Sequence, residues 1–221
     1  MEHLLRLEAE AKYFFGATDR SYEQTLMDEL LKIMEEVESL FGPRDRSYKL
    51  LPPRISECLC AHPYIYPFRK IRIYLPTEAK TRHLASLYLA HEAIHVLSPT
   101  LSWATVLEEG LATWFSDAYM DRVYGLQFPA PNRWYDAALR AVAPLMAKNK
   151  FVVKELRARQ PQISKIDETL LVEVAGIERE QAKLLCADFE SSWLVGSTWG
   201  EHATRGARIF ANVFRSLWKS G

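Results

Sequence analysis

Long apolar runs, cysteine and an excess of charge of either sign are all lacking in this sequence. No stretch approaches the roughly 20 consecutive apolar residues that cross a membrane, and the first residues lack the apolar segment of a secretory signal peptide. Lys plus Arg and Asp plus Glu each total 28, so the formal net charge is zero. Nucleic-acid and anionic-membrane partners usually require a basic excess. We therefore expect a cytoplasmic protein with no nucleic-acid partner and no membrane partner.

Cysteine is limited to Cys58, Cys60 and Cys186. An odd number this small does not fit a disulfide framework. Cys58 and Cys60 lie close to His62, but they lack the paired spacing of a structural zinc module. We expect packed thiols at these positions.

The composition is otherwise that of a globular protein, with 48% apolar and 25% charged residues. Apolar residues recur at helical spacing along most of the chain. Helices are expected at residues 22–40, 81–97, 103–124, 132–148, 151–159, 166–175, 178–189 and 201–218. The sequence thus predicts an α+β protein that is mostly α-helical. Residues 1–130 should form a first domain and residues 131–221 a helical C-terminal subdomain, with an active-site cleft between them.

The clearest strand covers residues 70–75. Ile71, Ile73 and Leu75 share one face of it, and charged or aromatic side chains share the other. A charged outer face suits a half-exposed or edge strand. Residues 44–67 hold four prolines and are expected to be irregular.

Residues 91–95 are His-Glu-Ala-Ile-His and fit the pattern H-E-x-x-H. On a helix, His91 and His95 lie on the same face, one turn apart. Their imidazoles can therefore bind one zinc ion at roughly 2.0–2.1 Å. Glu92 is turned by about 100° from His91, which lets its carboxylate face an open coordination position and act as a general base. The pattern is short, but it is typical of zinc metalloproteases.

The helix around this motif is expected to be apolar on every side. Between Leu84 and Leu97, Glu92 and the two histidines are the only acidic or basic residues. Such a helix should be buried, and buried carboxylates and imidazoles need either polar partners or a metal. The sequence leaves two alternatives, which are a zinc site and a metal-free cluster of hydrogen-bonded Glu and His.

A catalytic zinc site needs a third protein ligand and one open position. The next acidic residues are Glu108 and Glu109, which precede Gly110. In an antiparallel helical hairpin, His91 would lie about 10 Å before the end of the first helix and Glu109 about 9 Å into the second, so the two would be level. Gly110 would let these two helices approach closely. The spacing does not decide between the two glutamates, and one of them should lie on a solvated face.

The motif followed by Glu-Glu-Gly-Leu-Ala at residues 108–112 resembles the gluzincins. These are zinc metallopeptidases whose third ligand is a Glu on the next helix. The resemblance implies a zincin-like domain with one zinc ion per chain, and it places the third ligand at Glu109. It also implies that the strand at residues 70–75 is the edge at which an extended peptide pairs. The spacer at residues 96–108 is shorter than in the large members of the family.

The expected metal ligands are thus His91, His95 and Glu109, and the expected catalytic base is Glu92. Zinc would acidify its bound water and polarise the substrate carbonyl. Glu92 would take the water proton and deliver it to the leaving amine. The oxyanion needs a further donor. Candidates for this donor are Tyr119, Tyr124, Tyr135 and His202, of which we select His202 and Tyr119.

These patterns together predict a zinc-dependent metallopeptidase that acts on a peptide or protein. One alternative is a catalytically inactive zincin-like protein with a regulatory or protein-interaction role, although the intact Glu92 disfavours it. A metal-free helical interaction protein and a zinc amidase with a non-peptide substrate are the others. The sequence carries no signal for the oligomeric state.

Overall fold

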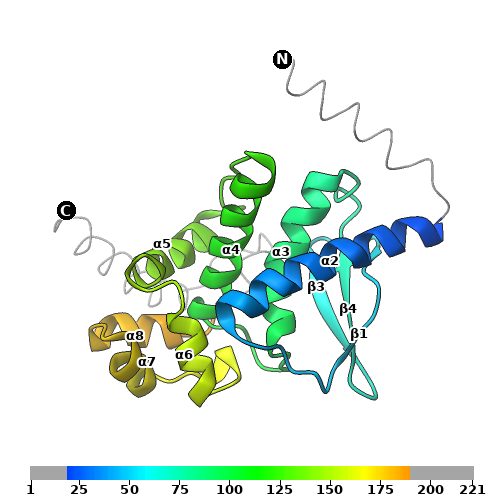
Figure 1. The fold of residues 1–221 in the computed structure, drawn as a ribbon. Helices are drawn as coiled ribbons and strands as arrows, with labels where there is room; N and C mark the ends of the chain where they lie inside the picture. The colour runs from blue at the N-terminus through cyan, green and yellow to red at the C-terminus, as the bar shows by residue number, and fades with distance from the viewer. Residues whose placement is uncertain (1–18, 190–221) are drawn as a thin grey trace, which may run out of the picture.

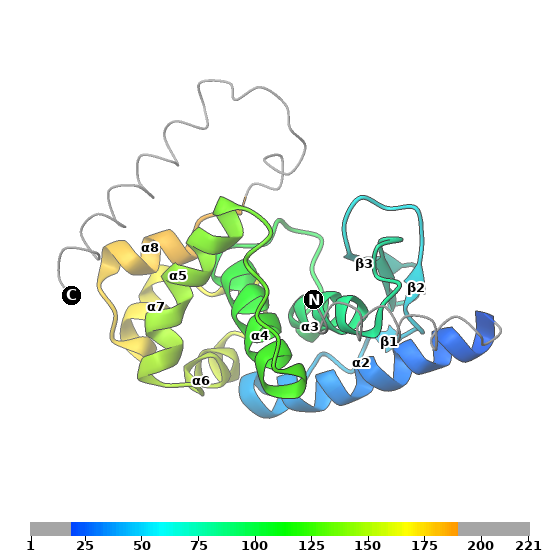
Figure 2. The ribbon, with the colours of Figure 1, turned by 90° about the horizontal axis from the view of Figure 1, so that it is seen from above.

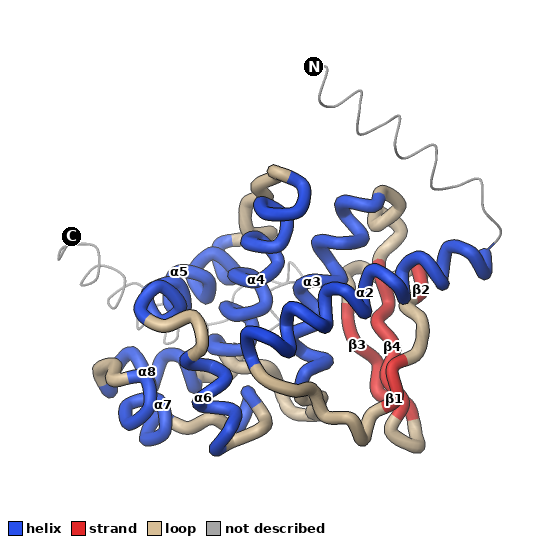
Figure 3. The backbone as a smooth tube through the Cα atoms, in the orientation of Figure 1, coloured by secondary structure: helices blue, strands red, loops and turns tan. Residues whose placement is uncertain are grey.

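The computed structural model describes residues 19–189 of the chain. Four short strands gather at one end of this part, and helices make up most of the remainder (Figure 3). The expected class, α+β and mostly α-helical, is therefore confirmed. None of the described helices combines the length and the apolar character needed to cross a membrane. The cytoplasmic location stays a prediction.

Strand β4 (Lys70–Leu75) has the predicted bounds, and Ile71, Ile73 and Leu75 are buried against the core. The other face of β4 is partly exposed, so of the two predicted alternatives the half-exposed strand is confirmed and the edge strand is wrong. Strand β4 pairs in parallel with β1 (Lys49–Leu50) and β2 (Arg54–Ile55), and antiparallel with β3 (His62–Tyr66). Since the start of β4 pairs with both β1 and β3, these two lie on opposite sides of it.

The edge assignment failed because the proline-containing segment before β4 is not irregular throughout. It supplies β1, β2 and β3, which together cover both sides of β4. Pro63 lies within β3, and an outer strand tolerates a proline because the missing N–H is not needed on its free side. The alternation of Ile65 with Tyr64 and Tyr66 was the sequence signal for this strand.

Helices α3 (Arg82–Leu97) and α4 (Val106–Tyr124) form the predicted antiparallel hairpin. His95, late in α3, contacts Glu108 at the start of α4, and Ser86, early in α3, contacts Tyr124 at the end of α4. Helix α4 begins three residues later than predicted, because the Thr105 hydroxyl accepts the backbone N–H of Glu108 and so caps the first turn.

Four further helices follow the hairpin. They are α5 (Arg133–Lys148), α6 (Val152–Arg159), α7 (Glu168–Ala175) and α8 (Arg179–Cys186), with a short 3₁₀ turn at Ile163–Lys165. Viewed from above, α4 separates this group from α3 and the sheet (Figure 2). Helix α5 packs directly on α4, and the buried apolar side chains of both parts form one cluster. The domain boundary at residue 130 stays a prediction.

Helix α2 (Asp19–Phe41) runs along the outside of α3 (Figure 1). Its Glu29 is buried and accepts hydrogen bonds from the hydroxyls of Ser86, Tyr119 and Tyr124. One carboxylate therefore ties α2 to both helices of the hairpin. Because each of these hydroxyls has Glu29 as a partner, the burial of the four polar groups is compensated.

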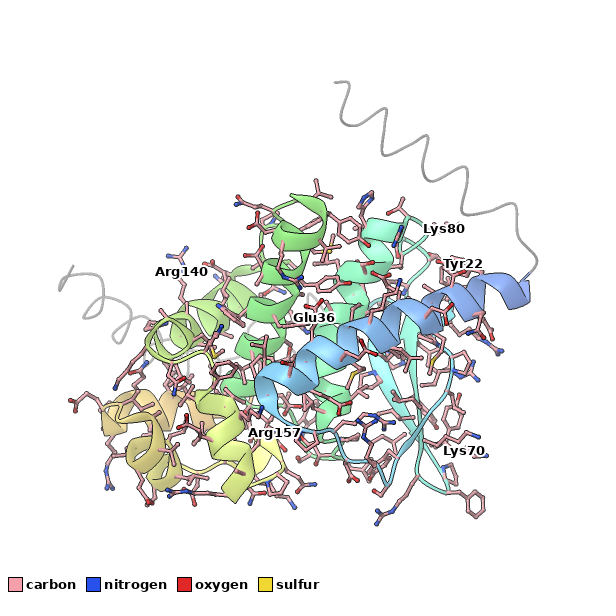
Figure 4. The ribbon with its side chains drawn as sticks, in the orientation of Figure 1. Tyr22, Glu36, Lys70, Lys80, Arg140 and Arg157 are labelled. Carbon is pink, nitrogen blue, oxygen red and sulfur yellow. The ribbon has the colours of Figure 1, made fainter. Side chains whose placement is uncertain are left out.

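The C-terminal end of α2 is held by a buried arginine of α6. Figure 4 shows Arg157 beside this end, and its guanidinium donates to the carbonyl oxygens of Phe41, Gly42 and Pro43 at 2.6–3.0 Å. Gly42 directly follows the last residue of α2, and its φ of 88° lies in the left-handed region. Arg157 thus satisfies carbonyls that a helix terminus leaves unpaired and places a cation at the negative end of the helix dipole.

Candidate metal centre

Three side chains of the hairpin meet where the two helices are level. His91 and His95 of α3 and Glu109 of α4 each offer a ligand atom, and these atoms all lie within 4.8 Å of one another. Nε2 of His91 lies 3.2 Å from Glu109 Oε2, and Nε2 of His95 lies 3.6 Å from Glu109 Oε1. This group could hold a metal ion with two imidazole nitrogens and one carboxylate.

The neighbouring Glu108 plays a different part. Its Oε1 lies 3.0 Å from Nδ1 of His95, so the carboxylate contacts the ring nitrogen that faces away from Glu109. A proton held on Nδ1 by this contact leaves the lone pair of Nε2 free for a metal. The other oxygen of Glu108 is buried and has no hydrogen-bond partner among residues 19–189.

The expectation that one of the two glutamates lies on a solvated face is wrong. Glu108 is 3% exposed and Glu109 is 9% exposed. Helix α4 packs against α3, α5 and α8. An apolar stripe cannot indicate the buried face of a helix that is buried on most sides.

Glu92 is buried, at 5% exposure, and borders the same cavities as His91. Burial raises the pKa of this carboxyl above its ordinary value, although His95 and His91 act in the opposite direction. A carboxylate whose pKa is raised is a stronger base, which is the property that proton abstraction from water requires.

The charges around the two imidazoles favour a cation. Burial alone would lower the pKa of His95, but Glu109 and Glu108 outweigh it and raise this pKa to about 10. Burial would likewise raise the pKa of Glu109, yet His95 and His91 lower it overall. Buried carboxylates that stabilise an imidazolium also provide the negative charge that a divalent metal ion needs.

Tyr135 of α5 is the tyrosine that lies at this site. Its ring centroid is 5.6 Å from that of His91, and it borders both cavities that contain Glu92. Burial, followed by the charges of Glu109 and Glu92, raises the pKa of its phenol. The hydroxyl therefore remains protonated at neutral pH and can donate a hydrogen bond.

Gly110 explains how α5 comes close enough to place Tyr135. A Cβ atom at residue 110 would lie 2.5 Å from the carbonyl oxygen of Ala138 and 2.6 Å from a methyl group of Val142. The close approach predicted for Gly110 therefore exists, but its partner is α5 and not α3. Ala138 lies about one turn after Tyr135, so this contact fixes the height at which Tyr135 faces the metal ligands.

Tyr119, one of the two donors selected from the sequence, does not lie at this site. The hydroxyl of Tyr119 donates to Glu29 at 3.1 Å and borders neither of the cavities beside Glu92. His202 lies outside the described residues. Tyr124 contacts Ser86 and Glu29 at the far end of the hairpin. Of the three candidates within residues 19–189, the structure brings Tyr135 to the site.

Glu92 borders two cavities. One has a volume of about 360 Å³ and is bordered by β3 residues, by Glu108 and by the exposed Trp103. The other has a volume of about 290 Å³ and is bordered by Leu87, Tyr88 and residues 128–131. Cys60, Ala61, His91, Glu92 and Tyr135 border both. Of the three candidate ligands, His91 thus borders both cavities, and His95 and Glu109 border the larger one.

No family model matches the chain, and neither a curated protein nor a solved structure matches it.

Proposed function

We propose that this chain is a zinc-dependent peptidase with a zincin-like domain of the gluzincin type. The observation that carries the proposal is the convergence of His91, His95 and Glu109 within 4.8 Å, with the buried Glu92 beside them. The resemblance of residues 91–95 and 108–112 to the gluzincin motifs supports it, since the Glu that the resemblance implies is the one in this group.

The donor set fits zinc. Two imidazoles and one carboxylate are the ligands of many catalytic zinc sites, in which a fourth position stays open for water or substrate. Glu108 supplies the partner that such a histidine usually has on its other ring nitrogen. The contact with Nδ1 of His95 leaves Nε2 of the same ring facing Glu109, as zinc coordination requires.

A zinc ion bound by these three residues would lower the pKa of a coordinated water to about 7 and polarise the substrate carbonyl. Glu92 accepts the proton of the attacking water and delivers it to the amine that leaves, so the peptide C–N bond breaks with no net change in protons on the protein. The phenol of Tyr135 donates a hydrogen bond to the oxygen on which negative charge develops.

A peptide is the substrate that suits the shape of the site. Strand β3 borders the larger cavity, and among residues 19–189 its only strand partner is β4, so its other side offers backbone groups with which an extended chain can pair. Strand addition would fix the direction of the peptide, and the two cavities would take the side chains on either side of the scissile bond. The role that the resemblance gives to β4 is thus proposed for β3.

Peptide hydrolysis by the zinc-loaded protein tests the proposal. Wild-type protein should cleave members of a mixed peptide library, and Glu92→Gln should bind zinc as tightly as wild type but cleave them at least about 10²-fold more slowly, because its amide cannot accept the proton. A zinc-loaded wild type that cleaves no peptide would refute the peptidase. Equal rates in wild type and Glu92→Gln would refute the role of Glu92.

A further inference from the structure

The smaller cavity beside Glu92 carries an acidic group whose charge no residue of the described chain neutralises. We infer that this cavity is the specificity pocket of the proposed peptidase and that Asp117 selects a lysine or arginine side chain of the peptide. The inference rests on the proposed function and names the class of substrate that the site would take.

Much of the cavity wall is apolar. Leu87 and Tyr88 of α3 border the cavity, and so do Phe128, Pro129 and Pro131 of the segment after α4. These surfaces suit the methylene groups of a long side chain, which lose water on entering the cavity.

The α4 wall is polar, but its hydroxyls are already engaged. Thr113 Oγ1 donates to the carbonyl oxygen of Glu109 at 2.9 Å, and Ser116 Oγ donates to the carbonyl oxygen of Thr113 at 3.1 Å. Their protons therefore point to their own helix. Asp117 is the group on this wall that is left to bind a charged ligand.

Asp117 has no ion-pair partner within residues 19–189. Burial raises the pKa of its carboxyl most, the backbone amide of Phe128 lowers it, and the nearby Asp121 raises it further. A cation beside the carboxylate would offset this desolvation, whereas an apolar side chain would deepen it.

The distance from the metal ligands requires a long side chain. Asp117 lies eight positions after Glu109 on α4, which is about 12 Å along the helix axis. Glu92 and Asp117 both border the cavity, so a side chain that enters it beside Glu92 can extend toward Asp117. Lysine and arginine combine the required reach with a terminal positive charge.

Peptide binding to the zinc-loaded Glu92→Gln variant tests the inference without hydrolysis. Fluorescein-labelled hexapeptides of alanine would carry either lysine or norleucine at the third or the fourth position, and their dissociation constants would be measured by fluorescence anisotropy. Norleucine has the same aliphatic stem but no charge. At one of the two positions, the peptide with lysine should bind about tenfold more tightly than the peptide with norleucine.

The same peptides, bound to two further variants in the Glu92→Gln background, separate a local effect from a general one. Asp117→Asn should abolish the preference for lysine and leave norleucine binding nearly unchanged. Asp121→Asn removes the same charge one turn further along α4, outside both cavities, and should keep the preference. Equal binding of lysine and norleucine at both positions, a preference that survives Asp117→Asn, or no binding of either peptide would overturn the inference. Hydrolysis by wild-type protein is scored separately, so failure of the subsite and failure of the peptidase remain distinguishable.

Discussion

Nδ1 of His95 lies 3.0 Å from Oε1 of Glu108, and this contact turns the opposite ring nitrogen toward Glu109. Two consecutive residues of α4 therefore act on the same imidazole from two sides. Glu109 and His95 both belong to the group of side chains that could hold a metal ion, and Glu108 orients the His95 ring. The arrangement follows from the start of α4 at Val106, because this start places both glutamates in the first turn, level with the motif of α3.

Removing Glu108 should weaken metal binding without removing a ligand. We expect Glu108→Ala to reduce zinc affinity by about 10- to 100-fold, since His95 loses the partner that fixes its orientation. Competition with a chromophoric chelator measures this. Glu57→Ala, which removes a carboxylate far from the cluster in sequence, serves as the control and should leave the affinity unchanged. An unchanged affinity in Glu108→Ala would show that Glu108 does not support the metal.

Tyr135→Phe should lower kcat by about 10²- to 10³-fold and leave KM nearly unchanged, because the lost hydrogen bond forms only as charge develops on the substrate oxygen. Steady-state kinetics on a cleaved peptide give both constants. The matched variant Tyr119→Phe loses a hydroxyl bound to Glu29. It should keep its activity and lose about 1 kcal/mol of stability. A reversed outcome, with Tyr119→Phe inactive and Tyr135→Phe active, would restore the sequence-based choice.

Gly110→Ala should affect both stability and activity. The added Cβ meets the carbonyl oxygen of Ala138, a backbone atom that moves only if α5 moves. We expect a loss of about 1–3 kcal/mol in the free energy of unfolding and a lower kcat, because Tyr135 moves with α5. Denaturant unfolding and kinetics measure the two effects.

The control for this substitution is Gly125→Ala at the other end of α4. Gly125 has a φ of 64° and no atom within 4 Å of an added Cβ. Its replacement should cost about 1–2 kcal/mol through backbone strain alone and leave kcat unchanged. Full activity in Gly110→Ala would contradict the link between this glycine and Tyr135.

Replacing the buried Arg157 by alanine should lower the free energy of unfolding substantially. Arg157 is 7% exposed and donates to three consecutive carbonyls at the end of α2. Its loss leaves these carbonyls unpaired and should cost about 2–4 kcal/mol, as measured by chemical denaturation. Arg159→Ala, two residues later, removes an exposed ion pair with Glu173 and should cost less than about 1 kcal/mol. Similar losses in the two variants would contradict the proposed role of Arg157.

Local patterns predicted the parts of the site that lie on single elements. The i and i+4 spacing placed His91 and His95 on one face of α3, and alternation gave the bounds and the inner face of β4. The rise per residue was enough to put Glu109 level with His91. Each of these inferences uses only the geometry of one helix or strand, or of two helices joined by a short turn.

Contacts between elements distant in the sequence were not predictable in this way. Tyr135 reaches His91 because α5 packs closely on α4 at Gly110, and nothing in residues 132–148 identifies that partner. Tyr119 lies on the opposite side of α4 because Glu29 of α2, 90 residues away, accepts its hydroxyl. The role of Glu108 depends on which ring nitrogen of His95 it meets, which spacing does not specify.

The zinc content of the purified protein tests the central claim most directly. After dialysis against metal-free buffer, mass spectrometric metal analysis should find close to one zinc ion per wild-type chain, and the double variant His91→Ala, His95→Ala should retain almost none while keeping its helical circular dichroism. A wild-type protein that binds no zinc, or a folded double variant that still holds one zinc per chain, would contradict a metal centre built on His91, His95 and Glu109.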